Sequence, residues 1–102
     1  MKQQFVFPAV LYYDEDNLNY AVAFYDIDVF TEGTTVEDAF KSAKDYLEAY
    51  IKFSMYLNDD VDIATSYVVV KEEHENDIVL LVDAEVDPKE NEKNFDNDIF
   101  DD

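Results

Sequence analysis

The sequence contains no cysteine, no tryptophan and a single glycine, and it sets only seven Lys and Arg residues against 26 Asp and Glu residues. Without cysteine the chain has no disulfide framework, no thiolate zinc site and no cysteine nucleophile. The shortage of basic side chains leaves a formal net charge of -19. Such a field repels nucleic acids and anionic lipids, because phosphate contacts need cations that displace counterions. We therefore expect no direct nucleic-acid binding by this chain alone and no membrane association.

Long apolar runs are also absent, which argues against a membrane span. The run Phe5 to Tyr13 resembles the core of a signal peptide, but the acidic "DEDN" directly after it spoils that interpretation. Together with the absence of cysteine, this favours the cytoplasm as the location. The acidity itself suits a basic protein partner, whose encounter it would accelerate, and it equally suits solubility or a salty habitat.

Apolar residues make up 48% of the 102 residues and aromatic residues 16%, so the chain can bury one modest core. Aromatic and β-branched residues predict strands at 5–13, 19–27 and 28–33, the first two joined as a hairpin. Pro8 lies in the first of these, which predicts an edge or a bulge there. The segments 66–73 and 77–86 predict a second hairpin of two strands around the turn "EEHEND".

A long helix is predicted from about Val36 to about Leu57, because apolar residues recur there at three- and four-residue spacing. Thr35 followed by Asp38 is a variant capping box, and Thr34 with Glu37 is the alternative in a shifted register. The only glycine, Gly33, stands just before this cap. We interpret it as a structural residue that lets the chain turn sharply from strand to helix through a backbone conformation that is costly for other residues.

Composition divides the chain into a folded domain at 1–88 and an acidic tail at 89–102, which we expect to be disordered in isolation. In the tail, three apolar residues are spaced among the acids: Phe95, Ile99 and Phe100. Acidic segments of this kind often become ordered when they bind a partner.

Motifs for chemistry are weak. His74 is the only histidine and lies in the predicted hairpin turn, where a solvated role is the simplest interpretation. The stretch "DEDNLN" begins like a calcium loop, but leucine stands at the third ligand position and asparagine replaces the required glycine. A cluster of Asp26 and Asp28 with Asp14 and Asp16 across the hairpin would be a magnesium site of the kind a nuclease uses, although carboxylates are common enough here to meet by chance. We predict no catalytic residue, no metal and no cofactor.

Tyrosines and phenylalanines at alternating strand positions could stack on RNA bases, but the basic residues that should accompany them are missing. Core packing and a protein interface explain the aromatic residues better.

Three stretches, "FPAVLYYDEDN", "YAVAFYDIDVFTEGTTVEDAFKSAKDYLEAYI" and "DIVLLVDAEVD", together resemble the HicB family of antitoxins from bacterial type II toxin–antitoxin pairs. The most specific part is the step from strand to helix, which follows a Thr-x-Gly-x-Thr pattern and then a hydrophobe, two acids and alanine. The matching positions are Thr31, Gly33, Thr35, Val36, Glu37, Asp38 and Ala39. The sequence departs from the family at Tyr25 and Asp28, where prolines are usual, and it carries the acidic tail where many members append a DNA-binding module.

The resemblance implies an α+β domain in which an antiparallel sheet of three or four strands, in the order β-β-β-α-β-β, carries one long helix on a face. The arrangement would be partly ferredoxin-like or RNase H-like. It also implies a partner, a small basic HicA-like mRNA interferase whose site an acidic, aromatic surface would cover. A metal-dependent RNase H-like nuclease or RNA-binding domain, and an orphan domain that only dimerises, are the alternatives.

Under the antitoxin interpretation, we predict partner contacts in both acidic turns and in the tail, and self-association through a sheet edge or the helix. The predicted contact residues are Asp14, Glu15, Asp16, Asp26, Asp28, Glu32, Phe95, Ile99 and Phe100. Gly33, Thr35 and Asp38 are assigned to the turn and the helix cap.

Overall fold

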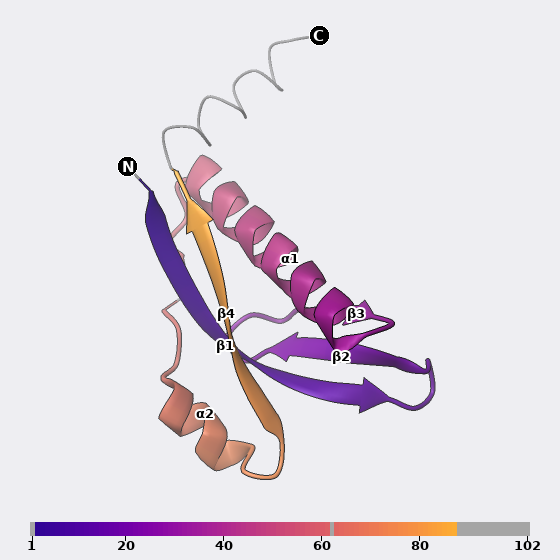
Figure 1. The fold of residues 1–102 in the computed structure, drawn as a ribbon. Coiled ribbons are helices and arrows are strands. Elements are labelled where there is room, and N and C mark those ends of the chain that lie inside the picture. The colour runs from indigo at the N-terminus through magenta and orange to yellow at the C-terminus, as the bar shows by residue number, and fades with distance from the viewer. Residues whose placement is uncertain (1, 62, 88–102) are drawn as a thin grey trace, which may run out of the picture.

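A computed structural model describes residues 2–61 and 63–87, so the acidic tail with Phe95, Ile99 and Phe100 lies outside the described residues. Four strands, β1 (Gln3–Asp14), β2 (Asn19–Phe24), β3 (Phe30–Gly33) and β4 (Ile78–Val86), form one sheet in the order β3-β2-β1-β4. All pairings are antiparallel. The helix α1 (Val36–Tyr56) runs diagonally over one face of this sheet (Figure 1). The predicted α+β fold is confirmed.

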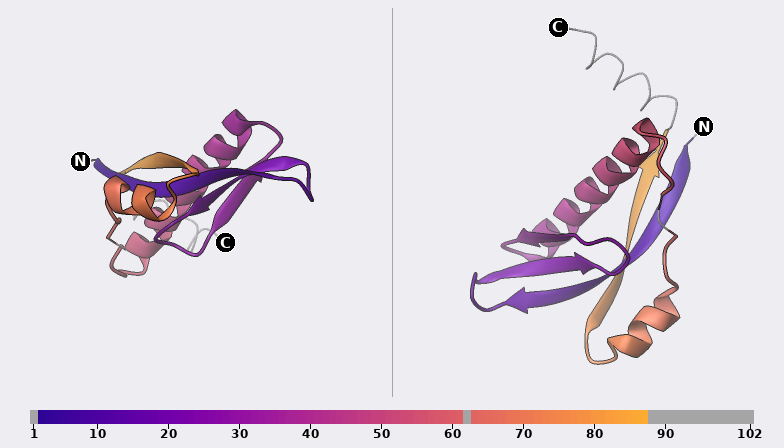
Figure 2. Two further views of the ribbon diagram at one scale, coloured as in Figure 1. Left: turned by 90° about the horizontal axis from the view of Figure 1, so that it is seen from below. Right: turned by 180° about the vertical axis from the view of Figure 1, so that it is seen from behind.

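The turn of the β1–β2 hairpin and the short helix α2 (Tyr67–Glu73) lie at opposite sides of the molecule, as both views in Figure 2 show. The C-terminal end of α1 lies near the end of β4 (Figures 1 and 2). In the described part of the chain no helix combines the length and hydropathy needed to cross a membrane.

The prediction of an edge or a bulge at Pro8 is wrong, because β1 is a central strand and Pro8 lies within its regular pairing with β4. Its pairing with β2 begins only at Ala9, opposite Phe24, while Pro8 itself faces Leu81 of β4. The Pro8 carbonyl accepts a hydrogen bond from the Tyr25 N–H at 3.1 Å, so this residue directs its backbone polar groups to the β2 side. The missing N–H of proline therefore falls where β2 has already ended, and no ladder bond is lost.

The predicted start of α1 is confirmed at Thr35, whose hydroxyl accepts from the Asp38 N–H at 3.0 Å. The end comes within a residue of the prediction and uses asparagine where glycine is usual. Asn58 adopts a left-handed conformation with φ 59°, and Asp59 N–H reaches the Ser54 carbonyl at 2.9 Å. Because Asn58 N–H also bonds to Met55, this is a Schellman ending that satisfies the last carbonyls of the helix.

The reason expected for Gly33 is wrong. Its φ does not lie in the left-handed region, so an L-residue could adopt its backbone conformation. What excludes a side chain is space, since a Cβ added there would lie 2.4 Å from the backbone nitrogen of Ala39 and 2.7 Å from the carbonyl carbon of Asp38. The first turn of α1 thus sits directly on β3, and the Thr31 hydroxyl fixes the approach by donating to the Ala39 carbonyl at 3.2 Å.

The prediction of a strand over 66–73, and of a hairpin around it, is wrong, because α2 occupies this segment. Only Val70 of α2 is fully buried. One contact to the helix comes from a distant part of the chain, since the Tyr25 hydroxyl donates to the Glu73 carboxylate. The end of the helix is closed locally, where the Lys71 ammonium donates to the carbonyls of Glu75 and Asp77 at 3.2 and 2.7 Å. The burial of Val70 and the Tyr25 bond override the strand preference of three consecutive valines.

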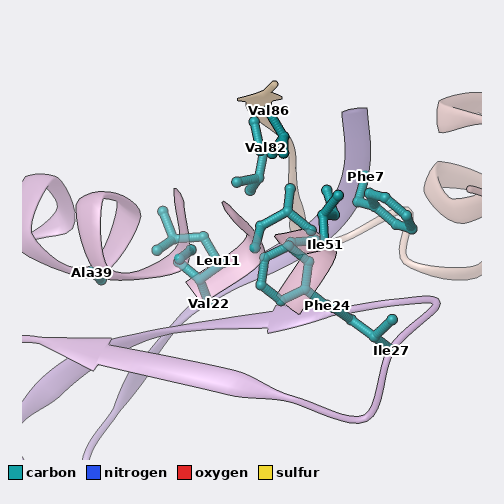
Figure 3. Close-up of a cluster of buried hydrophobic side chains, with 13 residues drawn as sticks. Phe7, Leu11, Val22, Phe24, Ile27, Ala39, Ile51, Val82 and Val86 are labelled. Atoms are coloured by element: carbon teal, nitrogen blue, oxygen red, sulfur yellow. The ribbon is translucent and has the colours of Figure 1, made fainter. Parts of the chain in front are cut away.

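The core lies between α1 and the sheet (Figure 3). From the helix it takes the residues that face the sheet at three- and four-residue spacing, Ala39, Ala43, Leu47 and Ile51. From the strands it takes alternate residues, Phe7, Ala9, Leu11, Val22, Phe24, Val82, Ala84 and Val86, with Ile27 from the β2–β3 loop. The intervening strand residues therefore point to the opposite face of the sheet.

Candidate partner-binding surface

The sheet face opposite α1 carries two rows of side chains that run across three strands. Directly paired residues of antiparallel strands share a face, so Tyr12, Ala21 and Glu32 form one row. The neighbouring row comprises Val10, Ala23 and Phe30. Tyr12, Phe30 and Glu32 are exposed. We call these two rows the open face; it exposes two aromatic side chains and one carboxylate, and exposed aromatic residues are typical of a protein interface.

The open face is hollowed where it approaches α2. A groove of about 400 Å³ is lined by Val10, Tyr12, Ala23, Phe24, Tyr25, His74 and Asp77. His74 is half-buried on its wall, with Nδ1 2.9 Å from the Asp77 carboxylate and its ring edge-to-face with Tyr25. It ends α2 and is not at the tip of a hairpin. With a carboxylate partner but no nucleophile or second base among the groove residues, it has the surroundings of a structural histidine.

The first acidic turn closes the β1–β2 hairpin next to the open face. The carboxylate of Asp14 accepts from the backbone N–H groups of Asp16 and Asn17 at 3.0 and 3.2 Å, and from the Asn17 side chain at 2.8 Å. The Asn17 side chain, followed by these backbone bonds, lowers the pKa of Asp14 below its usual value. Asp14 therefore shapes the turn as an anion, and Glu15 and Asp16 are the acids that it presents to solvent.

Leu18 is a further exposed residue of this turn, and the sequence-based prediction of contact residues, which followed the acids, did not include it. It is 73% exposed and has a left-handed backbone with φ 54°, which is unfavourable for leucine. The signal in the sequence is a leucine within an otherwise polar turn. On the α1 side of the same hairpin end, Tyr13 and Tyr20 pack edge to face with ring centroids 5.1 Å apart.

The second acidic turn lies at the other end of β2, and its two aspartates differ. Asp26 is held within the fold, since its carboxylate accepts from the Thr65 N–H at 2.9 Å and from the Thr65 hydroxyl at 2.6 Å. This bond ties the β2–β3 loop to the segment before α2. Asp28 is exposed. The structure thus brings Glu32 close to the first turn through the row with Tyr12, and it separates Asp26 and Asp28 from that group.

The magnesium cluster considered from the sequence is wrong. Asp14 lies opposite Asn19 at one end of the hairpin, whereas Asp26 and Asp28 follow Phe24 at the other end. Five residue steps of β-strand separate the ends, roughly 17 Å, which is far beyond the span of a metal site. Among the residues that the structure describes, no group of three or more His, Asp or Glu side chains is placed to hold a metal ion.

The architecture defines a small α+β domain with one long helix on one face of its sheet, while the other face exposes Tyr12, Phe30 and Glu32. Neither a family model nor a curated protein matches the sequence. Among solved structures, the N-terminal domain of the antitoxin HicB from Burkholderia pseudomallei superposes with a TM-score of 0.65 at 28% identity, over 76% of this chain and 95% of that domain. The HicB antitoxin of the same organism gives 0.62 at 27% identity, over 76% of this chain and 61% of that one.

A third similar structure is a HicA3 and HicB3 toxin–antitoxin complex, with a TM-score of 0.57 and 19% identity over 78% of this chain and 98% of that one. The chain therefore has the fold of the HicB N-terminal domain. Its match spans less than two thirds of the HicB antitoxin of Burkholderia pseudomallei.

Proposed function

We propose that this protein is a non-enzymatic antitoxin that binds a small basic HicA-like mRNA interferase and occludes its active site. The observation that carries the proposal is a sheet face that exposes Tyr12, Phe30 and Glu32 beside the acidic β1–β2 turn, on a domain with the HicB fold. A basic RNA-cleaving protein presents cations to its substrate, and an acidic surface with exposed aromatic residues can take the place of that substrate. The net charge of -19 would also steer the encounter.

Within this proposal the acidic residues have two roles. Glu15, Asp16, Asp28 and Glu32 are exposed and would contact the toxin directly. Asp14 and Asp26 would act through the loops that their carboxylates hold in place. Phe95, Ile99 and Phe100 of the tail would add apolar contacts. The protein would act in the cytoplasm, as a homodimer or a higher homo-oligomer.

The proposal is tested by measuring the affinity of a catalytically inactive toxin for three forms of this protein. Glu15→Gln combined with Glu32→Gln removes one charge in the first acidic turn and one on the open face next to it. We expect this to weaken binding about tenfold or more, since close charge pairs at such interfaces are worth roughly 1.5 kcal/mol or more. The matched control, Glu72→Gln with Glu75→Gln, removes two exposed charges at and just after α2 and should change the affinity less than twofold. Equal losses in both variants would show that only net charge matters and would refute the assignment of this surface.

A further inference from the structure

The outer side of α1 carries a second apolar stripe, beside the one that faces the sheet. Tyr46, Phe53 and Leu57 recur at intervals of seven and four residues along the C-terminal half of the helix, and Ala49 lies between them. Phe53 is 53% exposed and Leu57 is 48% exposed. Together they line a groove of about 630 Å³, which we call the α1 groove, with Tyr50, Ser54, Asp59 and Asp60 as its remaining walls. A helix with apolar stripes on two sides is typical of one that packs against two partners.

The electrostatics at the end of the α1 groove point to the chemistry of that second partner. Asp59 and Asp60 follow the C-terminus of α1, where the helix dipole is already negative. The last turn of α1 consists of Phe, Ser, Met and Tyr, and so brings no cation to neutralise this end. Two carboxylates at the negative pole of a helix are unfavourable in the free protein. A lysine or arginine placed there by a partner would relieve the repulsion.

We propose that the α1 groove docks a cationic amphipathic helix of a partner protein. The apolar side of that helix packs on Tyr46, Phe53 and Leu57, and its Lys or Arg residues reach Asp59 and Asp60. The stripe from Tyr46 to Leu57 is about 16 Å long, which corresponds to three turns of a docked helix. A second copy that packed its own α1 groove here would fit poorly, because that groove is lined by no Lys or Arg that could meet Asp59 and Asp60.

This inference rests on the proposed function for the identity of the partner, since a small basic toxin is the expected source of such a helix. The α1 groove and the open face belong to opposite sides of the sheet. The helix docked in the α1 groove would therefore be a different part of the toxin from the surface that contacts the open face.

The test is a titration of the isotope-labelled protein by NMR with a 14-residue helical peptide of leucine and lysine in amphipathic order, against a scrambled peptide of the same composition. We expect backbone signals to shift at the α1 groove residues, with a several-fold weaker effect of the scrambled peptide. Phe53→Gln with Leu57→Gln should weaken peptide binding about tenfold or more, because both substitutions remove apolar contact area from the groove. The matched control Val68→Gln, at an exposed apolar position of α2, should leave binding unchanged.

The charge component is tested with Asp59→Asn combined with Asp60→Asn, which should weaken peptide binding and reduce its salt dependence relative to Glu72→Gln with Glu75→Gln. Equal binding of both peptides, signal shifts confined to the open face, or equal losses in the two charge variants would each overturn the proposal. So would a homodimer in sedimentation experiments that Leu57→Gln dissociates, because the occupant would then be a second copy. No toxin takes part in the titration, so failure of toxin binding in the separate affinity assay bears on the proposed function and leaves this result intact.

Discussion

At the scale of single residues, Gly33 must be glycine because the first turn of α1 lies so close to it, and not because its backbone conformation requires glycine. A side chain at Gly33 would meet the backbone of Asp38 and Ala39, which cannot rotate away as a flexible side chain would. The packing of α1 on β3 therefore depends on the absence of one methyl group. The sequence alone identified the residue but could not show this reason, because the contact joins a strand and a helix whose separation is set by packing.

We predict that Gly33→Ala destabilises the protein by about 2 kcal/mol, the usual cost of forcing a methyl group into a filled space. Urea denaturation measures this difference. Thr34→Ala, at the adjacent exposed position, is the control and should cost well under 1 kcal/mol. A neutral or stabilising effect of Gly33→Ala would show that α1 does not sit on β3 at this distance.

Tyr25 gives a prediction about alkaline pH. The hydrogen bond that its hydroxyl donates to Glu73 raises the pKa of Tyr25 above the ordinary value of 10.0, with burial and the charges of Glu73 and Asp26 adding to the effect. A raised pKa means that the bond stabilises the fold fully below pH 10 and that this contribution is lost as the pH rises through the higher folded value. Tyr25→Phe lacks this contribution.

The stability difference between the wild type and Tyr25→Phe should therefore be positive at pH 8 and should shrink above pH 10. Thermal melts across this range measure it, and Tyr67→Phe, at an exposed tyrosine, controls for general alkaline effects. A difference that stays constant up to pH 11 would mean that the Tyr25–Glu73 bond is not formed.

At the scale of elements, the helix α1 and the first three strands follow from local signals. The capping threonine, the spacing of apolar residues and the alternating strands each agree with the final packing. The helix α2 does not follow from local signals, because Tyr67 and the three valines that follow it favour a strand. This helix is decided by the burial of Val70 and by the bond from the distant Tyr25, neither of which a local pattern reveals. The candidate partner-binding surface was predicted only in part, because contacts between distant parts of the chain also decide it. Strand pairing brings Glu32 close to the first acidic turn. Asp26 is held within the fold by Thr65, which lies in a distant loop.

The conformation of α2 can be tested by substitution. Val68 and Val69 are exposed on this helix, where valine is a poorer helix former than alanine. Val68→Ala with Val69→Ala should therefore stabilise the protein by about 0.5–1 kcal/mol in total. If the segment were instead a strand, the same change would destabilise it, because alanine is poorly suited to strands. Denaturation in urea, with far-ultraviolet circular dichroism as the signal, separates the two outcomes.

At the scale of the whole molecule, the net charge of -19 dominates behaviour in solution. Ion pairs do little to offset it, since Lys44 with Asp83 at 3.2 Å and Lys52 with Glu48 at 3.1 Å are partly exposed to solvent. The folded chain therefore carries unbalanced self-repulsion, which dissolved salt screens. The same repulsion explains why a basic partner would stabilise the protein on binding.

We predict that the melting temperature rises between 20 mM and 500 mM NaCl. Recovery of roughly 1 kcal/mol by screening would raise it by about 4–8 °C in a domain of this size. Potassium chloride at equal ionic strength should give the same rise, because screening does not depend on the identity of the monovalent ion. A melting temperature that falls with salt would show that attractive charge pairs outweigh the repulsion.

The most direct test of the antitoxin account is an RNA-cleavage assay. The product of a neighbouring gene that encodes a small basic protein would be purified alone and together with this protein, and its cleavage of RNA measured with and without an equimolar amount of the partner. The account predicts a stable complex in which cleavage is suppressed, with activity recovered in the Glu15→Gln, Glu32→Gln variant at limiting concentrations. Undiminished cleavage in the presence of excess wild-type protein, or cleavage of RNA by this chain itself, would contradict it.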